Sequence, residues 1–245
     1  SPGAAVDFTE GVYKSSVAFW PAGYGIQARA LGKVIIEPPD GGSNYTFVGG
    51  DREAGPFTES IRLSANMAVG DTSATVTSSS GYSAGDVVMM FSGESSNSTG
   101  DNIIPLYKQF FTITGISGNV ITFSEESKYA FNTADDAKIM ASTARPLVNS
   151  RIEGFHFRNN STFTGPYLHG IVYAYNVEVV NCRFDGYSAV GYASFSDKLI
   201  YRNVDFVGYT GPSTAAGTIE VTFDNITYTP GQTSQGIGLF IEESP

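Results

Sequence analysis

Two aspartates, Asp185 and Asp205, occupy neighbouring copies of a repeated segment, and they are the side chains best placed for chemistry. Hydrolysis of a glycosidic bond uses two carboxyl groups about 5 to 9 Å apart, one as acid and one as nucleophile or base. Side-chain alternation along the flanking strands points both aspartates outward, one copy of the repeat apart and two residues out of register. They are therefore the predicted catalytic pair.

The same positions also fit a purely structural role. The repeat places Arg183 below Asp205 and Arg158 below Asp185. Such exposed ion pairs would stabilise the fold by about 0 to 1 kcal/mol each. His156 falls in an outward column and is expected to be a solvated side chain, neither a ligand nor a base. A lyase would need a base near the sugar C5 proton and a cation that neutralises the uronate, and the sequence singles out no convincing set.

Aromatic side chains supply a second kind of chemistry, because sugar rings present apolar faces that stack on exposed aromatic rings. Tyr187 and Tyr209 each follow a glycine at the end of a repeat copy. The predicted glycan-binding residues are Tyr187, Tyr209 and Tyr192, and Tyr173 and Tyr175 add to the supply. These rings could instead fill turns or pack between subunits.

Other motifs give weaker evidence for a catalytic or metal-binding site. The segment Gly81-Tyr-Ser-Ala-Gly85 matches the nucleophile pattern G-x-S-x-G, but a strand rather than a helix follows it, so an ordinary turn is expected at Ser83. With His156 and His169 as the only histidines and Cys182 as the only cysteine, no metal site is predicted. No cofactor is predicted either.

A period of 22 residues organises the last part of the chain. It aligns Asn181, Asn203 and Asn225 in one column. The same spacing aligns apolar positions in four further columns: Val177, Leu199 and Val221; Val179, Tyr201 and Phe223; Cys182, Val204 and Ile226; and Phe184, Phe206 and Tyr228. A looser copy at residues 152–157 fits with a spacing of 27 and has Gly154 at the asparagine position.

This pattern predicts an all-β protein, specifically a right-handed parallel β-helix with a β-rich insertion. In each copy a short alternating strand, a bend at the asparagine and a second strand make one coil. Stacking coils about 4.8 Å apart builds apolar columns and lets the asparagine amides bond along their column. The alternative is an antiparallel β-sandwich, which has short alternating strands but does not need an asparagine at constant spacing.

Composition changes along the chain suggest three parts. Residues 1–63 form an opening segment with the first coil or coils, and the strand in Gly32–Gly42 could be the first coil. Residues 64–143 are a β-rich insertion, with a hairpin expected at Ile116–Val120 and a flexible loop at Gly93–Asp101. Residues 144–245 hold the repeated coils, and we expect the coil stack to be truncated at the C-terminus.

Charge and hydropathy exclude several classes of partner. A formal net charge of −10 repels phosphate backbones and anionic membrane surfaces, so no nucleic acid is expected as a partner. No apolar stretch approaches the roughly 20 residues that span a bilayer, so no membrane insertion is expected. The single Cys182 allows no internal disulfide, so packing, backbone ladders or oligomerisation must provide stability outside a cell.

Three segments together resemble the pectate-lyase-like superfamily of right-handed β-helices and, within it, the tailspikes and depolymerases of bacteriophages. They are Lys33-Val-Ile-Ile-Glu-Pro-Pro-Asp-Gly41, Gly81-Tyr-Ser-Ala-Gly-Asp-Val-Val88 and the coils from Ile152 onward. The resemblance covers nearly the whole chain and concerns architecture, so it carries no catalytic residue across. It implies a homotrimer, a location in the virion tail or otherwise outside the cell, and carbohydrate as the partner.

The function expected from these features is that of a tailspike, a receptor-binding protein. It would recognise bacterial capsular or O-antigen polysaccharide, could depolymerise it, and would assemble with other virion tail proteins. One alternative is a secreted polysaccharide lyase or hydrolase of the same fold. Another is a non-catalytic structural component of a virion or fibre.

Overall fold

The computed structural model describes residues 3, 5–14, 23–38, 47–49, 60–92, 107–143, 146–158, 169–185, 189–194, 196–208, 210–214, 220–230 and 240–241. The regular structure in these residues is strand, apart from the 3-10 helix η1 (Thr133–Asp135). The chain divides into two compact units. One takes residues 1–50 and 146–243, and the other takes residues 51–145.

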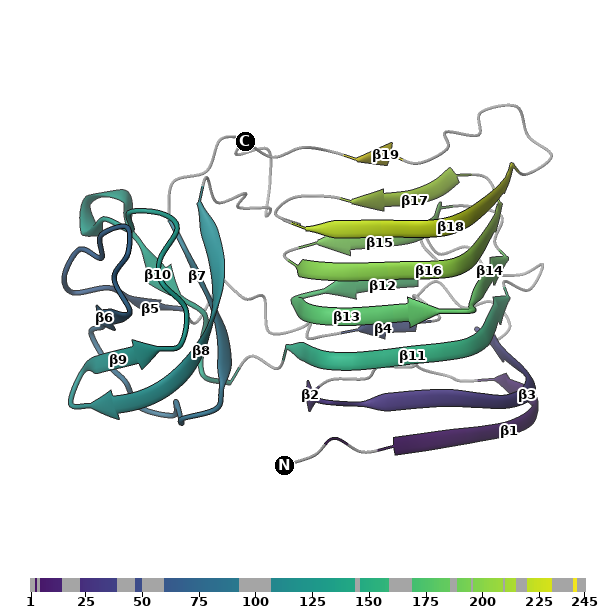
Figure 1. The fold of residues 1–245 in the computed structure, drawn as a ribbon, viewed down its shortest axis with the longest axis horizontal. Helices are drawn as coiled ribbons and strands as arrows, with labels where there is room; N and C mark the ends of the chain where they lie inside the picture. The colour runs from purple at the N-terminus through teal and green to yellow at the C-terminus, as the bar shows by residue number, and fades with distance from the viewer. Residues whose placement is uncertain are drawn as a thin grey trace. The chain divides into compact units, whose positions relative to one another are not determined.

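The first unit is the right-handed parallel β-helix that the repeat predicts, so the sandwich alternative is wrong. Its strands stack rung upon rung in two sheets, and every pairing between them is parallel (Figure 1). The larger sheet holds β1 (Ala5–Lys14), β2 (Gly23–Tyr24), β3 (Gln27–Glu37), β11 (Leu147–Arg158), β13 (Ala174–Val180), β14 (Arg183–Asp185), β16 (Asp197–Gly208) and β18 (Val221–Pro230). The smaller sheet holds β4 (Phe47–Gly49), β12 (His169–Val172), β15 (Ala189–Ser194), β17 (Thr210–Thr214) and β19 (Phe240–Ile241).

The predicted columns are present in the register. Val177 pairs with Leu199 and Leu199 pairs with Val221, so the period of 22 is one turn of the coil. The looser copy pairs Ile152 with Val179, which confirms the spacing of 27. The inward residues form one core, in which the rings of Phe157, Phe184 and Phe206 stack with centroids 4.9 and 5.3 Å apart.

Asparagine occupies the bend because the backbone adopts the left-handed conformation at that position. Asn181, Asn203 and Asn225 have φ between 52° and 54°, a region that asparagine tolerates better than most residues. Their amides bond along the column, from Asn203 Nδ2 to Asn181 Oδ1 at 3.0 Å and from Asn225 Nδ2 to Asn203 Oδ1 at 2.8 Å. Gly154 takes the same place with φ +84°.

The opening segment differs from expectation at one point. The strand around Val34 and Ile36 is buried as expected, but it belongs to β3, and β1 pairs with β3 as an earlier rung. The prediction of a first coil at Gly32–Gly42 is therefore wrong. The strand β1 was missed because apolar residues stand both at its inward position Val6 and at its outward position Val12, so its sequence shows no regular polar and apolar alternation.

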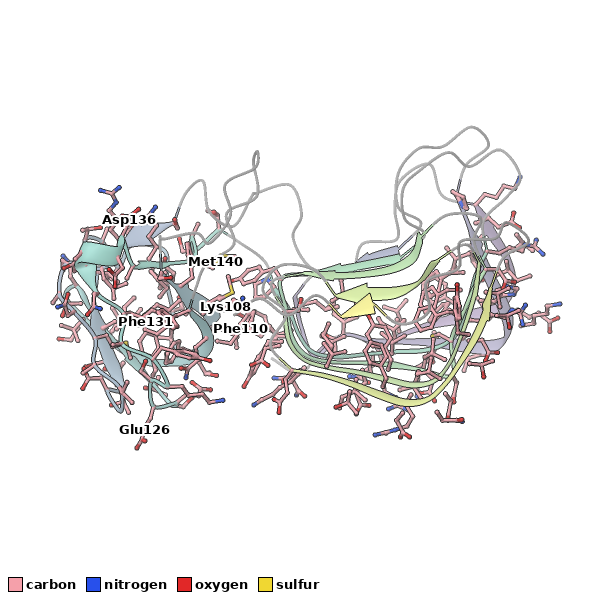
Figure 2. The ribbon with its side chains drawn as sticks, turned by 90° about the horizontal axis from the view of Figure 1, so that it is seen from above. Lys108, Phe110, Glu126, Phe131, Asp136 and Met140 are labelled. Atoms are coloured by element: carbon pink, nitrogen blue, oxygen red, sulfur yellow. The ribbon has the colours of Figure 1, made fainter. Side chains whose placement is uncertain are left out.

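The second unit is an antiparallel sheet with its own core. Its strands run in the order β5 (Ile61–Arg62), β10 (Lys138–Ile139), β7 (Val87–Phe91), β8 (Lys108–Ser117), β9 (Val120–Phe123) and β6 (Ser73–Thr75). The expected hairpin joins β8 to β9 through Gly118, whose φ is +55°. Phe131 lies inside this unit among the strands (Figure 2) and packs against Phe111. The loop expected at Gly93–Asp101 lies outside the described residues.

Candidate functional site

Beyond the asparagine bend, the larger sheet presents two outward columns of mostly polar residues, which we call the polar face. One column holds Ile35, His156, Arg183, Asp205 and Thr227. The other holds Arg158, Asp185, Val207 and Thr229, and Glu37 on the rung below is in contact with Arg158. Side chains in the two columns are two residues apart along each strand, so they share one side of the sheet.

Asp185 lies at the centre of this face and is bonded on both carboxylate oxygens. His156 Nε2 lies 2.7 Å from its Oδ2, and Arg183 Nε donates to Oδ1 and Oδ2 at 3.0 and 3.1 Å. The side chain of Asp185 is 23% exposed, and that of His156 is 22% exposed. A carboxylate held by two donors and still open to solvent is suited to act as a base or nucleophile.

The ion pairs differ from those expected. Arg158 bonds to Glu37 on the rung below and not to Asp185 on the rung above. Arg183 bonds to Asp185 on its own strand and not to Asp205. The reason is that His156 and Arg183 already occupy the Asp185 carboxylate, while the almost fully buried Glu37 needs a cation in contact.

Asp205 stands on the next rung, directly opposite Arg183 in the register. Asp185 pairs with Val207, so the two aspartates are one rung apart and offset by two residues, as the sequence indicated. Strand spacing and rise then separate their Cα atoms by roughly 8 Å. The side chain of Asp205 is half-buried.

His156 was missed as part of this group, and the expectation of a merely solvated histidine is wrong. Its partner Asp185 lies 29 residues later, because the contact joins neighbouring coils across a longer connection. The signal available in sequence was the spacing of 27, which places His156 beside Arg183, two residues before Asp185. Together, the His156 imidazole and the Arg183 guanidinium hold the Asp185 carboxylate in one orientation at the protein surface.

The outward face before the bend carries a different set of charges, arranged as a ladder. Arg151 bonds to Glu153 at 3.0 Å and also to Glu178, and Arg29 bonds to Asp7 at 2.8 Å. The hydrogen bond from Arg151 is the main cause that lowers the pKa of Glu153. Each acid in this ladder contacts a cation, so the ladder serves to hold the rungs together.

The predicted glycan-binding tyrosines lie where the structure gives no side chains. Tyr187 and Tyr209 are outside the described residues, and Tyr192 is described only as backbone of β15. Tyr173, expected to add an exposed ring, is buried with φ +56°. Tyr175 is half-buried, and its hydroxyl bonds to Lys198 Nζ at 3.0 Å.

Other candidate nucleophiles are accounted for by structure. Ser83 lies in a turn in which its backbone N–H donates to Asp86 Oδ2 at 2.8 Å, and strand β7 follows, as expected for an ordinary turn. Burial raises the pKa of the inward Cys182 thiol to about 12, which keeps it protonated and unreactive. Among the described residues no group of three acidic, histidine or cysteine side chains could hold a metal ion. No helix in the described part is long and apolar enough to cross a membrane.

Comparison with known proteins finds similarity in structure only. No protein-family model matches the sequence, and no curated protein matches it significantly. The tailspike protein gp49 of Pseudomonas phage LKA1 aligns with TM-score 0.57 and 15% identity over 91% of this chain and 37% of its own. The tailspike gp61 of Pseudomonas phage phi297 aligns with TM-score 0.53 and 14% identity over 97% of this chain and 39% of its own.

A third solved structure is that of the Gp54 tailspike of Acinetobacter baumannii bacteriophage AP22, in complex with capsular saccharide. It aligns with TM-score 0.46 and 10% identity, over 92% of this chain and 53% of its own. The chain thus has the fold of phage tailspikes, as the first two comparisons show, and spans less than two fifths of the length of those two proteins.

Proposed function

We propose that this chain is the β-helical part of a phage tailspike that binds a bacterial capsular or O-antigen polysaccharide. The shared fold with two Pseudomonas phage tailspikes supports this proposal. The acidic surface also favours it over a role at nucleic acid or anionic lipid. The proposed place of action is the virion tail, outside the host cell.

We further propose that the polar face cleaves the bound polysaccharide by hydrolysis. The carrying observation is that Asp185 and Asp205 share one outward face on adjacent rungs, with His156 bonded to Asp185. Asp185, held by His156 and Arg183, would serve as nucleophile or base. Asp205, two residues out of register, would protonate the leaving oxygen.

The test is to incubate the protein with a panel of capsular and O-antigen polysaccharides and measure the release of reducing ends. Asp185→Asn and Asp205→Asn should each lower the rate by at least about a hundredfold if they act as base and acid. Arg202→Gln is a matched control, because Arg202 forms an exposed ion pair with Asp224 before the bend. It should leave the rate unchanged.

The alternatives give different results in the same assay. Products with ultraviolet absorbance from an unsaturated uronate would indicate a lyase and would contradict the carboxylate pair. A polysaccharide that binds to the protein but yields no product would indicate an adhesin, which binds the polysaccharide without cutting it. No binding to any polysaccharide would favour a structural component of a virion or fibre.

Assembly into a homotrimer, and contact with other tail proteins, are part of the same proposal. A solenoid can pack one of its long sides against copies of itself while the polar face stays open, and the resemblance to tailspikes implies a trimer. Light scattering on the purified chain should then give a mass three times that of one chain. A mass of one chain at micromolar concentration would contradict the trimer.

A further inference from the structure

The second unit carries a pair of tyrosine rings at its surface. Tyr107 is 47% exposed, and its ring lies against that of Tyr129 with centroids 5.4 Å apart and planes tilted by 32°. Tyr129 is half-buried and meets Phe131 edge to face at 6.4 Å, while Phe131 is fully buried. The exposed ring therefore rests on a row of aromatic side chains that leads into the core.

Buried polar side chains fix the backbone that carries Tyr129. The Gln109 side chain donates from Nε2 to Glu126 O at 2.8 Å and accepts from Lys128 N at 2.7 Å. Ser127 donates from Oγ to Tyr129 O at 2.6 Å. Both Gln109 and Ser127 are almost fully buried. Figure 2 shows that this segment runs from Glu126, which points away from the unit, to Phe131 inside it.

The backbone of Tyr107 is fixed in the same manner. Its N–H donates to Ser92 Oγ at 3.2 Å, and its carbonyl accepts from Ser92 N at 2.9 Å. Ser92 is buried. Hydrogen bonds to buried side chains thus fix the backbone at Tyr107 and at Tyr129, in two different parts of the unit. The two rings together form one aromatic surface. A ring held in advance binds a flat ligand without the entropy cost of ordering itself.

The size and chemistry of this surface select its ligand. A protein partner would need about 800 Å² on each side, far more than two tyrosine rings provide. The net charge of −10 disfavours nucleobases on a phosphate backbone. A pyranose ring matches one tyrosine ring in size, and its face of C–H groups is apolar while its edge is polar.

We propose that Tyr107 and Tyr129 form a carbohydrate-binding site on the inserted unit, where one pyranose ring stacks on Tyr107. This goes beyond the proposed function of the β-helix, because the site would bind a sugar whether or not the polar face cleaves polysaccharide. The inserted unit then acts as a binding module of its own.

Saturation-transfer NMR on the whole chain tests this, with methyl β-D-glucopyranoside and methyl β-D-galactopyranoside as probes. At least one glycoside should receive saturation on the axial C–H protons of one ring face. Tyr107→Ala should weaken its binding roughly fivefold to tenfold, the loss of one stacking contact. Tyr107→Phe should retain binding, because it keeps the ring.

Two controls have comparable exposure and should bind as the wild type does. Ile116→Ala removes a side chain 36% exposed on the same unit, and Tyr24→Ala removes a tyrosine 38% exposed on β2 of the β-helix. The Asp185→Asn and Asp205→Asn variants should also keep the signal, which separates this site from the polar face. No transfer to either glycoside, or equal binding by Tyr107→Ala with an unchanged melting temperature, would overturn the proposal.

Discussion

The asparagines of the bend column stabilise the fold in two ways, by tolerating left-handed backbone and by bonding to each other through their amides. Substitutions can separate these two contributions. Asn203 has φ +52° and bonds through its side chain to both Asn181 and Asn225. Asn203→Gly keeps the conformation and loses the bonds, so we expect a loss of about 1 kcal/mol of stability. Asn203→Ala adds the strain of an alanine in left-handed backbone and should cost about 2 kcal/mol.

Denaturant unfolding of the two variants measures this difference. Equal losses would show that the left-handed conformation carries no penalty and that the amide bonds account for the whole effect. Asn149, which accepts from Asn176 at 2.7 Å in a shorter column, offers the same comparison at another bend.

Lys108 carries a buried amine whose charge state should affect the stability of the fold. Burial lowers its pKa to about 8 from the ordinary 10.5. Below pH 8 the amine is charged in both states, and its burial destabilises the fold. Between pH 8 and 10.5 the unfolded chain binds the proton and the folded chain does not, so this destabilisation falls as pH rises.

Lys108→Met should therefore raise the free energy of unfolding by up to about 3 kcal/mol at neutral pH. The gain should shrink as the pH rises from 8 and vanish above 10.5. Denaturant unfolding of both proteins across this range measures the change. Lys128→Met, at an exposed position of the same unit, is the control and should show no such trend. A gain that does not change with pH would show that the effect comes from packing and not from charge.

Residue contacts were predictable where the repeat fixes them and not elsewhere. The register that sets Asp205 opposite Arg183 follows from the period, since like positions stack. The period does not predict that Arg183 bonds to Asp185 instead of Asp205. Several charged side chains lie within reach of one another on this face, and which of them pair depends on how deeply each is buried. The Tyr107 and Tyr129 pair was missed, since no period relates two irregular segments of an antiparallel unit.

At the scale of elements, the stacked phenyl rings hold neighbouring rungs together. Phe184 is fully buried between Phe157 and Phe206, with planes within 13° of parallel on both sides. Phe184→Ala should leave a cavity that cannot collapse, because the backbone ladders fix the rung spacing. We expect a loss of about 3 to 5 kcal/mol, measured by denaturant unfolding.

Tyr228 provides the matched control in the same column. It continues the column beside Phe206 on β18 but is only half-buried. Tyr228→Ala should cost clearly less than Phe184→Ala, because part of its ring is already in water. Equal losses of stability in the two variants would mean that the contribution of a ring does not depend on its having a neighbour on both sides.

The whole molecule joins a solenoid, stabilised rung by rung, to a unit with a separate core. In the solenoid each rung contacts only its neighbours, so stability is a sum of rung and interface terms. Among the described residues, β11, β13 and β16 have partner strands on both sides, whereas β18 pairs only with β16 and β1 only with β3. Phe223 on β18 is half-buried, whereas its counterpart Tyr201 on β16 is buried.

This asymmetry predicts a gradient of local stability along the solenoid. Amide hydrogen exchange followed by mass spectrometry should be fastest in β1 and β18 and slowest in β11 and β13, because terminal rungs can open without exposing the central core. Peptides from β7 and β8 should exchange at a rate of their own, set by the second core. Equal protection from β1 to β18 would mean that the rungs unfold together, and Phe184→Ala would then lower protection in every rung rather than in its neighbours alone.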